Sequence, residues 1–164
     1  MILIGLGSNL PSPRYGAPAE TCAAALAALG EAGVAVQGVS RWYRSAPVPP
    51  SDQPWFVNGV AAVATDLAPA GLLAVLHGIE RDFGRARRAR DEARIIDLDI
   101  LAFDAHVSAP GETPVLPHPR LAERAFVLLP LAELAPEWRH PVSGLSAAEL
   151  ARRLPAGQIA EPIA

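Results

Sequence analysis

The stretch Arg94-Ile95-Ile96-Asp97-Leu98-Asp99-Ile100-Leu101-Ala102-Phe103 decides the fold of this chain, because it predicts a buried strand that carries two carboxylates. Its apolar and β-branched residues are typical of a strand. Side chains alternate along a strand, so Asp97 and Asp99 are expected on one face and the apolar residues between them on the other. Neighbouring carboxylates repel each other and resist desolvation, and a divalent cation such as Mg²⁺ would relieve both costs. Two solvated aspartates on an exposed face are the alternative interpretation of so short a pattern.

A cluster of arginines lies directly before the paired aspartates. Arginine supplies all 14 basic residues of the chain, and the members between positions 81 and 94 are Arg81, Arg85, Arg87, Arg88, Arg90 and Arg94. A guanidinium group binds phosphate through two parallel hydrogen bonds. Arginines for an anion beside carboxylates for Mg²⁺ therefore predict a site for a nucleotide polyphosphate. The alternative is a solvated basic helix end and loop.

The composition predicts one globular domain over residues 1–164, with 51% hydrophobic and 19% charged residues. The net charge of −3 argues against a general attraction to nucleic acid or to an anionic membrane, so any anion site must be local. A single cysteine, Cys22, excludes an internal disulfide and a multi-cysteine zinc site. The sequence has no recognisable signal peptide or membrane span. We therefore expect a cytoplasmic enzyme or binding domain.

The order of predicted elements indicates an α+β fold of the ferredoxin-like, split βαβ type, in which helices pack on an antiparallel sheet. Strands are expected at 2–6, 34–44, 55–65 and 94–103. Helices are expected at 18–29, 69–83 and 146–154, with a further helix in 125–134. The proline-rich segment 45–54 predicts a long functional loop, although it could be a simple connector. The tail after about residue 155 is expected to be loose.

Polar residues elsewhere in the chain are candidates for ligand binding. Asn58 interrupts an apolar strand, so its amide is either hydrogen-bonded within the core or in contact with a ligand. His77 and Glu80 lie three apart on one predicted helix face and could reach one ligand, although such residues are more often solvated. His118 is held between two prolines, which restrict its backbone, although a lone histidine is usually structural.

Seven short motifs, in order over roughly residues 4–140, resemble those of the 6-hydroxymethyl-7,8-dihydropterin pyrophosphokinases of folate synthesis. The motifs are Gly7-Ser8-Asn9-Leu10, Tyr43-Arg44-Ser45, Asp52-Gln53-Pro54 with Phe56 and Asn58, Ile79-Glu80 with Gly84-Arg85-Ala86-Arg87, Arg94 with Asp97-Leu98-Asp99-Ile100, Pro117-His118, and Arg124-Ala125-Phe126. Each motif is weak alone, but seven in the family's order are specific. The family is similar in fold to the ferredoxin-like arrangement predicted above.

The resemblance implies an enzyme that transfers pyrophosphate from ATP to the pterin hydroxymethyl group, releases AMP and uses two Mg²⁺ ions. Its implied partners are ATP and 6-hydroxymethyl-7,8-dihydropterin. We expect a monomer that binds neither nucleic acid nor a membrane. The implied catalytic residues are Asp97, Asp99, Arg85 and Arg94, with both aspartates as metal ligands. The implied ATP contacts are His77, Glu80, Arg87, Arg90, Ile100, His118 and Arg124. The implied pterin contacts are Ser45, Val48, Phe56, Asn58 and Phe126.

Two other functions compete with this interpretation. A nucleic-acid-binding module could share the fold, but the chain lacks the aromatic strand signature of such modules and its net charge is negative. A metal-dependent phosphodiesterase would share the carboxylates but would hydrolyse its substrate instead of transferring a group. A P-loop kinase is excluded, because the G-x-x-x-x-G-K motif cannot occur in a chain without lysine.

Overall fold

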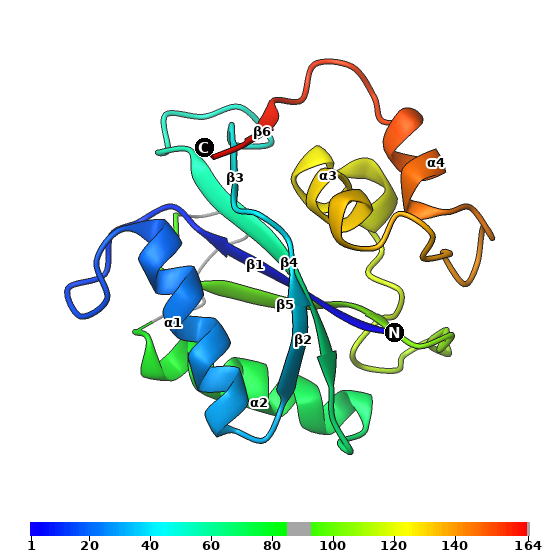
Figure 1. The fold of residues 1–164 in the computed structure, drawn as a ribbon, viewed down its shortest axis with the longest axis horizontal. Helices are drawn as coiled ribbons and strands as arrows, with labels where there is room; N and C mark the ends of the chain where they lie inside the picture. The colour runs from blue at the N-terminus through cyan, green and yellow to red at the C-terminus, as the bar shows by residue number, and fades with distance from the viewer. Residues whose placement is uncertain (85–92, 164) are drawn as a thin grey trace.

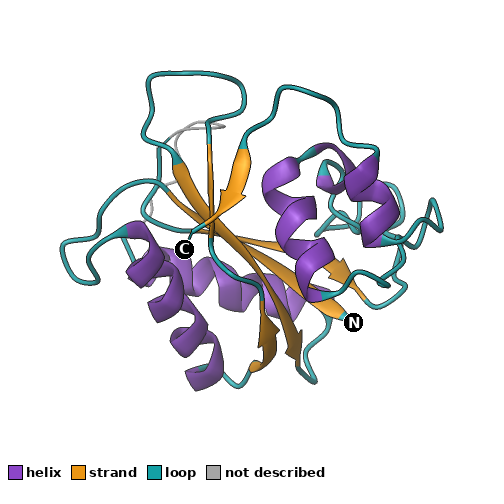
Figure 2. Ribbon diagram, turned by 45° about the horizontal axis from the view of Figure 1, so that its top comes forward, coloured by secondary structure: helices purple, strands orange, loops and turns teal. Residues whose placement is uncertain are grey.

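A computed structural model of the chain describes residues 1–84 and 93–163. Within these residues, a six-stranded sheet lies between two layers of helices (Figures 1 and 2). The strands are β1 (Ile2–Ser8), β2 (Ala35–Val39), β3 (Tyr43–Ser45), β4 (Phe56–Ala64), β5 (Asp97–Phe103) and β6 (Ala160–Pro162). The helices are α1 (Pro18–Glu31), α2 (Pro69–Asp82), the 3₁₀ turn η1 (Leu121–Glu123), α3 (Ala125–Leu134) and α4 (Ala147–Arg152). None of the helices in this described part of the chain is long and apolar enough to cross a membrane.

The sheet has the strand order β5-β1-β4-β3-β6, and β2 pairs with the other end of β4. Every pairing between these strands is antiparallel. The order strand, helix, strand, strand, helix, strand places β1 and β4 at the centre, which is the ferredoxin-like arrangement. The predicted fold class is therefore confirmed.

Each face of the sheet buries its own apolar cluster, because side chains alternate along the central strands. Ile4 and Leu98 point to one face, where they pack with residues of α1 and α2 such as Leu76. Leu3 and Leu101 point to the other face, which α3 and α4 cover (Figure 1). Strands β1 and β5 are thus packed on both faces, and their side chains have little freedom.

The predicted single strand at 34–44 is wrong, because the chain forms β2 and β3 with a break between them. At the break the Ser40 hydroxyl accepts a hydrogen bond from the backbone N–H of Val60 at 3.0 Å, a bond the strand ladder would otherwise supply. The ring of Trp42 covers Gly59, where a Cβ atom would lie 2.5 Å from a ring carbon. The break therefore follows from two local contacts on β4.

The predicted loose tail is also wrong for its last residues, since β6 pairs with β3. β4 occupies one edge of β3, and the tail satisfies hydrogen-bonding groups on the other. Pro162 is tolerated there because an edge strand needs donors on one side only. The C-terminus consequently returns to the sheet (Figure 1).

Candidate active site

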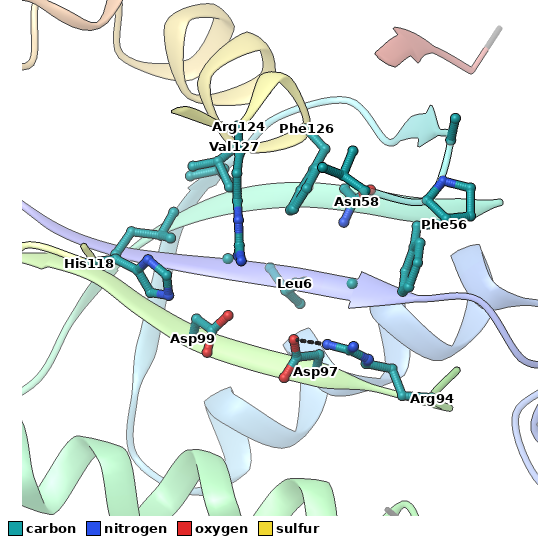
Figure 3. Close-up of a pocket in the computed structure, with 18 of the residues that line it drawn as sticks. Leu6, Phe56, Asn58, Arg94, Asp97, Asp99, His118, Arg124, Phe126 and Val127 are labelled. Atoms are coloured by element: carbon teal, nitrogen blue, oxygen red, sulfur yellow. Dashed lines mark hydrogen bonds and ion pairs between the residues drawn. The ribbon is translucent and has the colours of Figure 1, made fainter. Parts of the chain in front are cut away.

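A pocket opens on the face of the sheet that also carries α3, at the end where the proline-rich loop lies (Figure 3). β1, β4, β5, the proline-rich loop, the His118 turn and the start of α3 all contribute to its lining. Nine of the sequence-predicted site residues line it: Val48, Phe56, Asn58, Arg94, Asp97, Asp99, His118, Arg124 and Phe126. Segments that are far apart in the sequence therefore meet at one site.

Glycines of β1 form the floor of the pocket. Gly7 pairs with Asn58 of β4 on one side and with Asp97 of β5 on the other, and Gly5 pairs with Asp99. A Cβ atom at Gly7 would lie 3.0 Å from the Asn58 side-chain nitrogen, so a larger residue would crowd that amide. The missing side chains leave open space between the amide on one strand and the carboxylates on the other.

Asp97 and Asp99 both face this pocket, as the alternation along the strand predicted (Figure 3). The intervening Leu98 is 1% exposed on the opposite face, while both aspartates are only half-buried. The Arg94 guanidinium donates to Asp97 with an N–O distance of 2.7 Å, which partly balances the negative charge. The carboxylate pair is thus held in a defined direction but stays accessible from the pocket.

The donor set suits Mg²⁺ better than a metal that needs an all-protein cage. Among the residues in 1–84 and 93–163, no group of three or more histidine, cysteine, aspartate or glutamate side chains could hold a metal ion. Mg²⁺ is usually held by one or two carboxylates, with waters and substrate phosphates as its other ligands. Asp97 and Asp99 offer this kind of incomplete oxygen site.

Asn58 is fixed by a buried partner behind the pocket. The Ser45 hydroxyl donates to the Asn58 amide oxygen at 2.6 Å, and both side chains are at most 6% exposed. With the amide oxygen accepting from serine, the NH₂ group faces the floor beside Gly7. Ser45 itself does not line the pocket, so the structure places it behind Asn58.

Two phenylalanine rings stand in the pocket wall, each beside an arginine (Figure 3). The Arg94 guanidinium carbon lies 5.5 Å from the centre of the Phe56 ring, and that of Arg124 lies 5.3 Å from the centre of Phe126. These distances are in the range of cation–π interactions. Phe56 is the first residue of β4 and Phe126 the second residue of α3, so separate elements supply the aromatic surfaces.

His118 lies in the pocket lining and is neutral at pH 7. Burial lowers its pKa to about 4, with a further lowering from the positive charge of Arg124. Its Nδ1 accepts a hydrogen bond from the backbone N–H of Arg120 at 3.1 Å. The Nε2 atom therefore carries the proton in the neutral ring and can act as a donor.

This lowered pKa predicts a pH dependence of folding. The unfolded chain binds a proton at His118 below a pH of about 6.5, whereas the folded chain binds it only below about 4. The free energy of unfolding should therefore fall as pH decreases from 6.5 to 4, and this contribution is fully present above 6.5. Urea titrations at several pH values should show a shallower decline for His118→Gln than for the unchanged chain. Equal slopes would contradict the lowered pKa.

Three predicted nucleotide contacts do not line the pocket. Glu80 is 2% exposed, and its carboxylate accepts a hydrogen bond from the backbone N–H of Leu98 at 2.9 Å. The side chain of Ile100 is buried in the core between the sheet and α2, and His77 is half-buried on α2. Their proposed contacts with ATP stay predictions. The predicted Arg85, Arg87 and Arg90 fall outside the described residues.

Sequence reasoning missed Asn9 as a site residue. Its amide is 2% exposed and donates to the Gln53 side chain and to the Pro54 carbonyl, each at 3.1 Å. Its side-chain oxygen accepts from the Arg94 backbone N–H at 2.8 Å. Asn9 therefore joins the proline-rich loop to the residue that enters the aspartate strand. A buried asparagine directly after a strand, in the motif Gly7-Ser8-Asn9, was the available signal.

Comparison with known proteins gives a consistent result. The family model described as 7,8-dihydro-6-hydroxymethylpterin-pyrophosphokinase (HPPK) matches residues 3–136. A 2-amino-4-hydroxy-6-hydroxymethyldihydropteridine pyrophosphokinase of Methylorubrum extorquens is 45% identical over 136 residues, which is 82% of each chain. The protein of the same name from Pseudomonas aeruginosa is 45% identical over 141 residues, or 85% of this chain and 83% of that one. A third protein of this name, from Synechocystis, is 37% identical over 150 residues, or 90% of this chain and 73% of that one.

Solved structures support the fold. Wild-type HPPK-DHPS of Plasmodium falciparum superposes with a TM-score of 0.68 at 15% identity, over 93% of this chain. The complex of that wild-type protein with pteroate gives a TM-score of 0.69 at 14% identity. The chain spans less than half the length of these proteins, at 44% of each. At such low identity the similarity concerns the fold alone.

Proposed function

Because this chain belongs to the 7,8-dihydro-6-hydroxymethylpterin-pyrophosphokinase family, we propose that it transfers a pyrophosphate group from ATP to 6-hydroxymethyl-7,8-dihydropterin in folate biosynthesis. The observation that carries this function is the register across β1, which sets the Asn58 amide and the Asp97 carboxylate on either side of Gly7. One pocket thereby combines a surface for a flat polar heterocycle with ligands for a metal–phosphate group.

The side of the pocket formed by β4 and α3 is the proposed pterin site. The rings of Phe56 and Phe126 can cover the faces of the heterocycle, and aromatic surfaces suit a flat substrate. Asn58 is oriented by Ser45, so its amide can bind the polar edge of the ring in one direction. Val48 adds an apolar contact from the proline-rich loop, which forms the outer wall.

The side formed by β5 is the proposed nucleotide site. We propose that Asp97 and Asp99 hold two Mg²⁺ ions together with phosphate oxygens, which would supply neutralisation of the phosphate charge and polarisation of the hydroxyl. Arg94, Arg124 and the neutral His118 line the same space and can donate to phosphate oxygens. Arg85, Arg87 and Arg90 keep the phosphate-binding role that the sequence suggests.

The reaction is proposed to depend on positioning and electrostatics. The pterin hydroxyl oxygen attacks the β-phosphorus and loses its proton to water, the bond from that phosphorus to the bridging α-phosphate oxygen breaks, and AMP leaves with that oxygen. With a pKa of about 4, His118 is too weak a base at pH 7 to remove a hydroxyl proton efficiently. The fixed arginines and carboxylates can instead align the two substrates and balance the charge that shifts onto AMP.

The remaining parts of the proposal concern the state of the protein. We propose a single-domain monomer that acts in the cytoplasm on these two small molecules, without nucleic acid or membrane partners. One sheet with a core on each face is in accord with a single folding unit. The net charge of −3 gives no general attraction to nucleic acid.

The products of the reaction test this function. With ATP, Mg²⁺ and the reduced pterin, the chain should form AMP and pterin diphosphate in equal amounts, because the whole pyrophosphate group moves. Turnover should require a divalent ion, and ATP hydrolysis without pterin should be slow. Liquid chromatography of the mixture separates the possibilities. ADP would indicate a simple kinase, and free pyrophosphate with unmodified pterin would indicate a phosphodiesterase-like hydrolase.

The aromatic rings give a second prediction. Phe56→Ala and Phe126→Ala should each weaken pterin binding by about 1–3 kcal/mol, from lost burial and stacking. Binding of a non-hydrolysable ATP analogue should change much less, because the rings are assigned to the other substrate. Calorimetric titrations of both ligands measure this difference. Phe103→Ala is the matched control, since Phe103 ends β5 away from the pocket lining. A larger loss for the nucleotide than for the pterin would contradict the assignment.

A further inference from the structure

The C-terminal segment 158–163 lies beyond the family match, which ends at residue 136, and yet it contacts two walls of the pocket. Its central part is β6, which pairs Ser45 with Ala160 and Tyr43 with Pro162. The catalytic and binding motifs of the sequence do not include this segment. Its contacts with the pocket walls therefore call for a role beyond completing a sheet edge.

The first wall is the start of α3, which Gln158 holds from both sides of Arg124. The Ala125 backbone N–H donates to the Gln158 side-chain oxygen at 2.9 Å. The Gln158 side-chain nitrogen donates to the Glu123 carbonyl at 2.7 Å. The first N–H groups of a helix have no partner within the helix. In α3 the N-cap residue is Arg124, and its side chain makes no capping hydrogen bond to them. Gln158 supplies a partner from the tail and leaves the Arg124 side chain in the pocket.

The second wall is the beginning of the proline-rich loop. The Ala46 backbone N–H donates to the carbonyl of Ile159, the residue after Gln158, at 3.1 Å. Ala46 lines the pocket and is followed by the lining residues Pro47 and Val48. Consecutive tail residues thus hold the loop on one side and the start of α3 on the other.

On the basis of the proposed function, we propose that residues 158–160 position both walls of the pterin pocket and that Gln158 is a positioning residue for Phe126. Gln158 does not touch the substrate in this proposal. Gln158 fixes the backbone on both sides of Arg124 by binding the Glu123 carbonyl and the Ala125 N–H. Phe126 is the residue after Ala125. We call the contacts of Gln158 and Ile159 with the two walls the clamp. Its loss should widen the pocket and weaken pterin binding without removing any group that contacts the substrate.

Steady-state kinetics of Gln158→Ala and Gln158→Leu test this role. Leucine keeps much of the side-chain volume and removes both hydrogen bonds, so it separates bonding from packing. Because the walls of the pocket would lose their fixed position, the pterin KM and Kd should rise about fivefold or more, with a smaller fall in kcat. Measurements should be made well below the thermal midpoint. Gln37→Ala is the matched control, because Gln37 is exposed on β2 and lies outside the pocket lining.

Backbone amide exchange gives a second readout that does not depend on activity. In Gln158→Ala the Ala125 amide should exchange faster because its acceptor is lost, and Ala46 should follow if the two walls are coupled. A lower thermal midpoint with unchanged pterin KM and unchanged Ala46 exchange would overturn the proposal. The tail, including β6, would then only stabilise the fold. Wild-type protein that forms no AMP would refute the proposed function instead, and amide exchange would then decide on the clamp alone.

Discussion

Asp99→Asn should lower kcat by about 10²-fold or more while the far-ultraviolet circular dichroism spectrum stays unchanged, because it removes a charged ligand of the proposed Mg²⁺ ions that would stabilise the reacting phosphates. Asparagine has nearly the same shape, and Asp99 is half-buried at the pocket rather than within a core. The strand should therefore keep its pairing with Gly5 of β1. Asp97→Asn should have a comparable effect on kcat, with an additional loss of the 2.7 Å contact to Arg94.

The measurement needs a control for aspartate loss in general. Asp66→Asn changes an exposed residue between β4 and α2 and should leave kcat within a factor of about two, as expected for surface substitutions. Raising the Mg²⁺ concentration should partly restore turnover in Asp97→Asn or Asp99→Asn if the defect lies in metal binding. Near-normal turnover of both pocket variants would exclude the carboxylate pair as the metal site.

Glu80→Ala should lower the free energy of unfolding by about 2–4 kcal/mol. Its carboxylate is 2% exposed and accepts from the Leu98 backbone N–H, the residue between the two aspartates. Alanine would leave that buried donor without this acceptor and would create a cavity beneath β5. Denaturant titration measures the loss at neutral pH.

Glu80→Gln separates the structural contribution from nucleotide binding. The amide oxygen can still accept from Leu98, so this variant should retain most of the stability that Glu80→Ala loses. If Glu80 also contacts ATP, as the sequence suggests, Glu80→Gln should weaken nucleotide binding even though the protein remains folded. Equal destabilisation by both substitutions would show that the charge, rather than the hydrogen bond to Leu98, supports β5.

Local periodicity predicted the parts of the structure that depend on neighbouring residues. The alternation of Asp97 and Asp99 with Leu98 was sufficient to place both carboxylates on one face, and the structure places them there. The apolar spacing of α2 likewise contained a signal for Glu80. It follows Leu76 by four residues on the buried stripe, so its position indicated burial in the core rather than solvation.

Features that depend on distant partners were not predictable in the same way. β6 forms because β3 presents an edge to the tail, and nothing within residues 158–163 identifies that edge. The break at Ser40 depends on Val60 and Gly59, which lie about twenty residues away. Asn9 likewise gains its importance from Gln53 and Arg94. In each case the decisive contact joins two segments that are distant in sequence, and the residue pattern of neither segment indicates the other as its partner.

If Asn58 binds the pterin and Asp97 binds the metal–phosphate group, as proposed, the register through Gly7 sets the distance between the two substrates. Asn58 and Asp97 sit on the same rung of the ladder with one strand between them, so two inter-strand steps of about 4.8 Å separate their backbones by about 10 Å. Backbone hydrogen bonds set this length, and side-chain substitutions at the pocket rim cannot alter it. A one-residue insertion in β1 would change it at once, by moving one substrate's anchor along the strand relative to the other's. Under the proposed assignment, strand pairing therefore determines the separation of the two substrates, whereas the affinity for each can change without altering that separation.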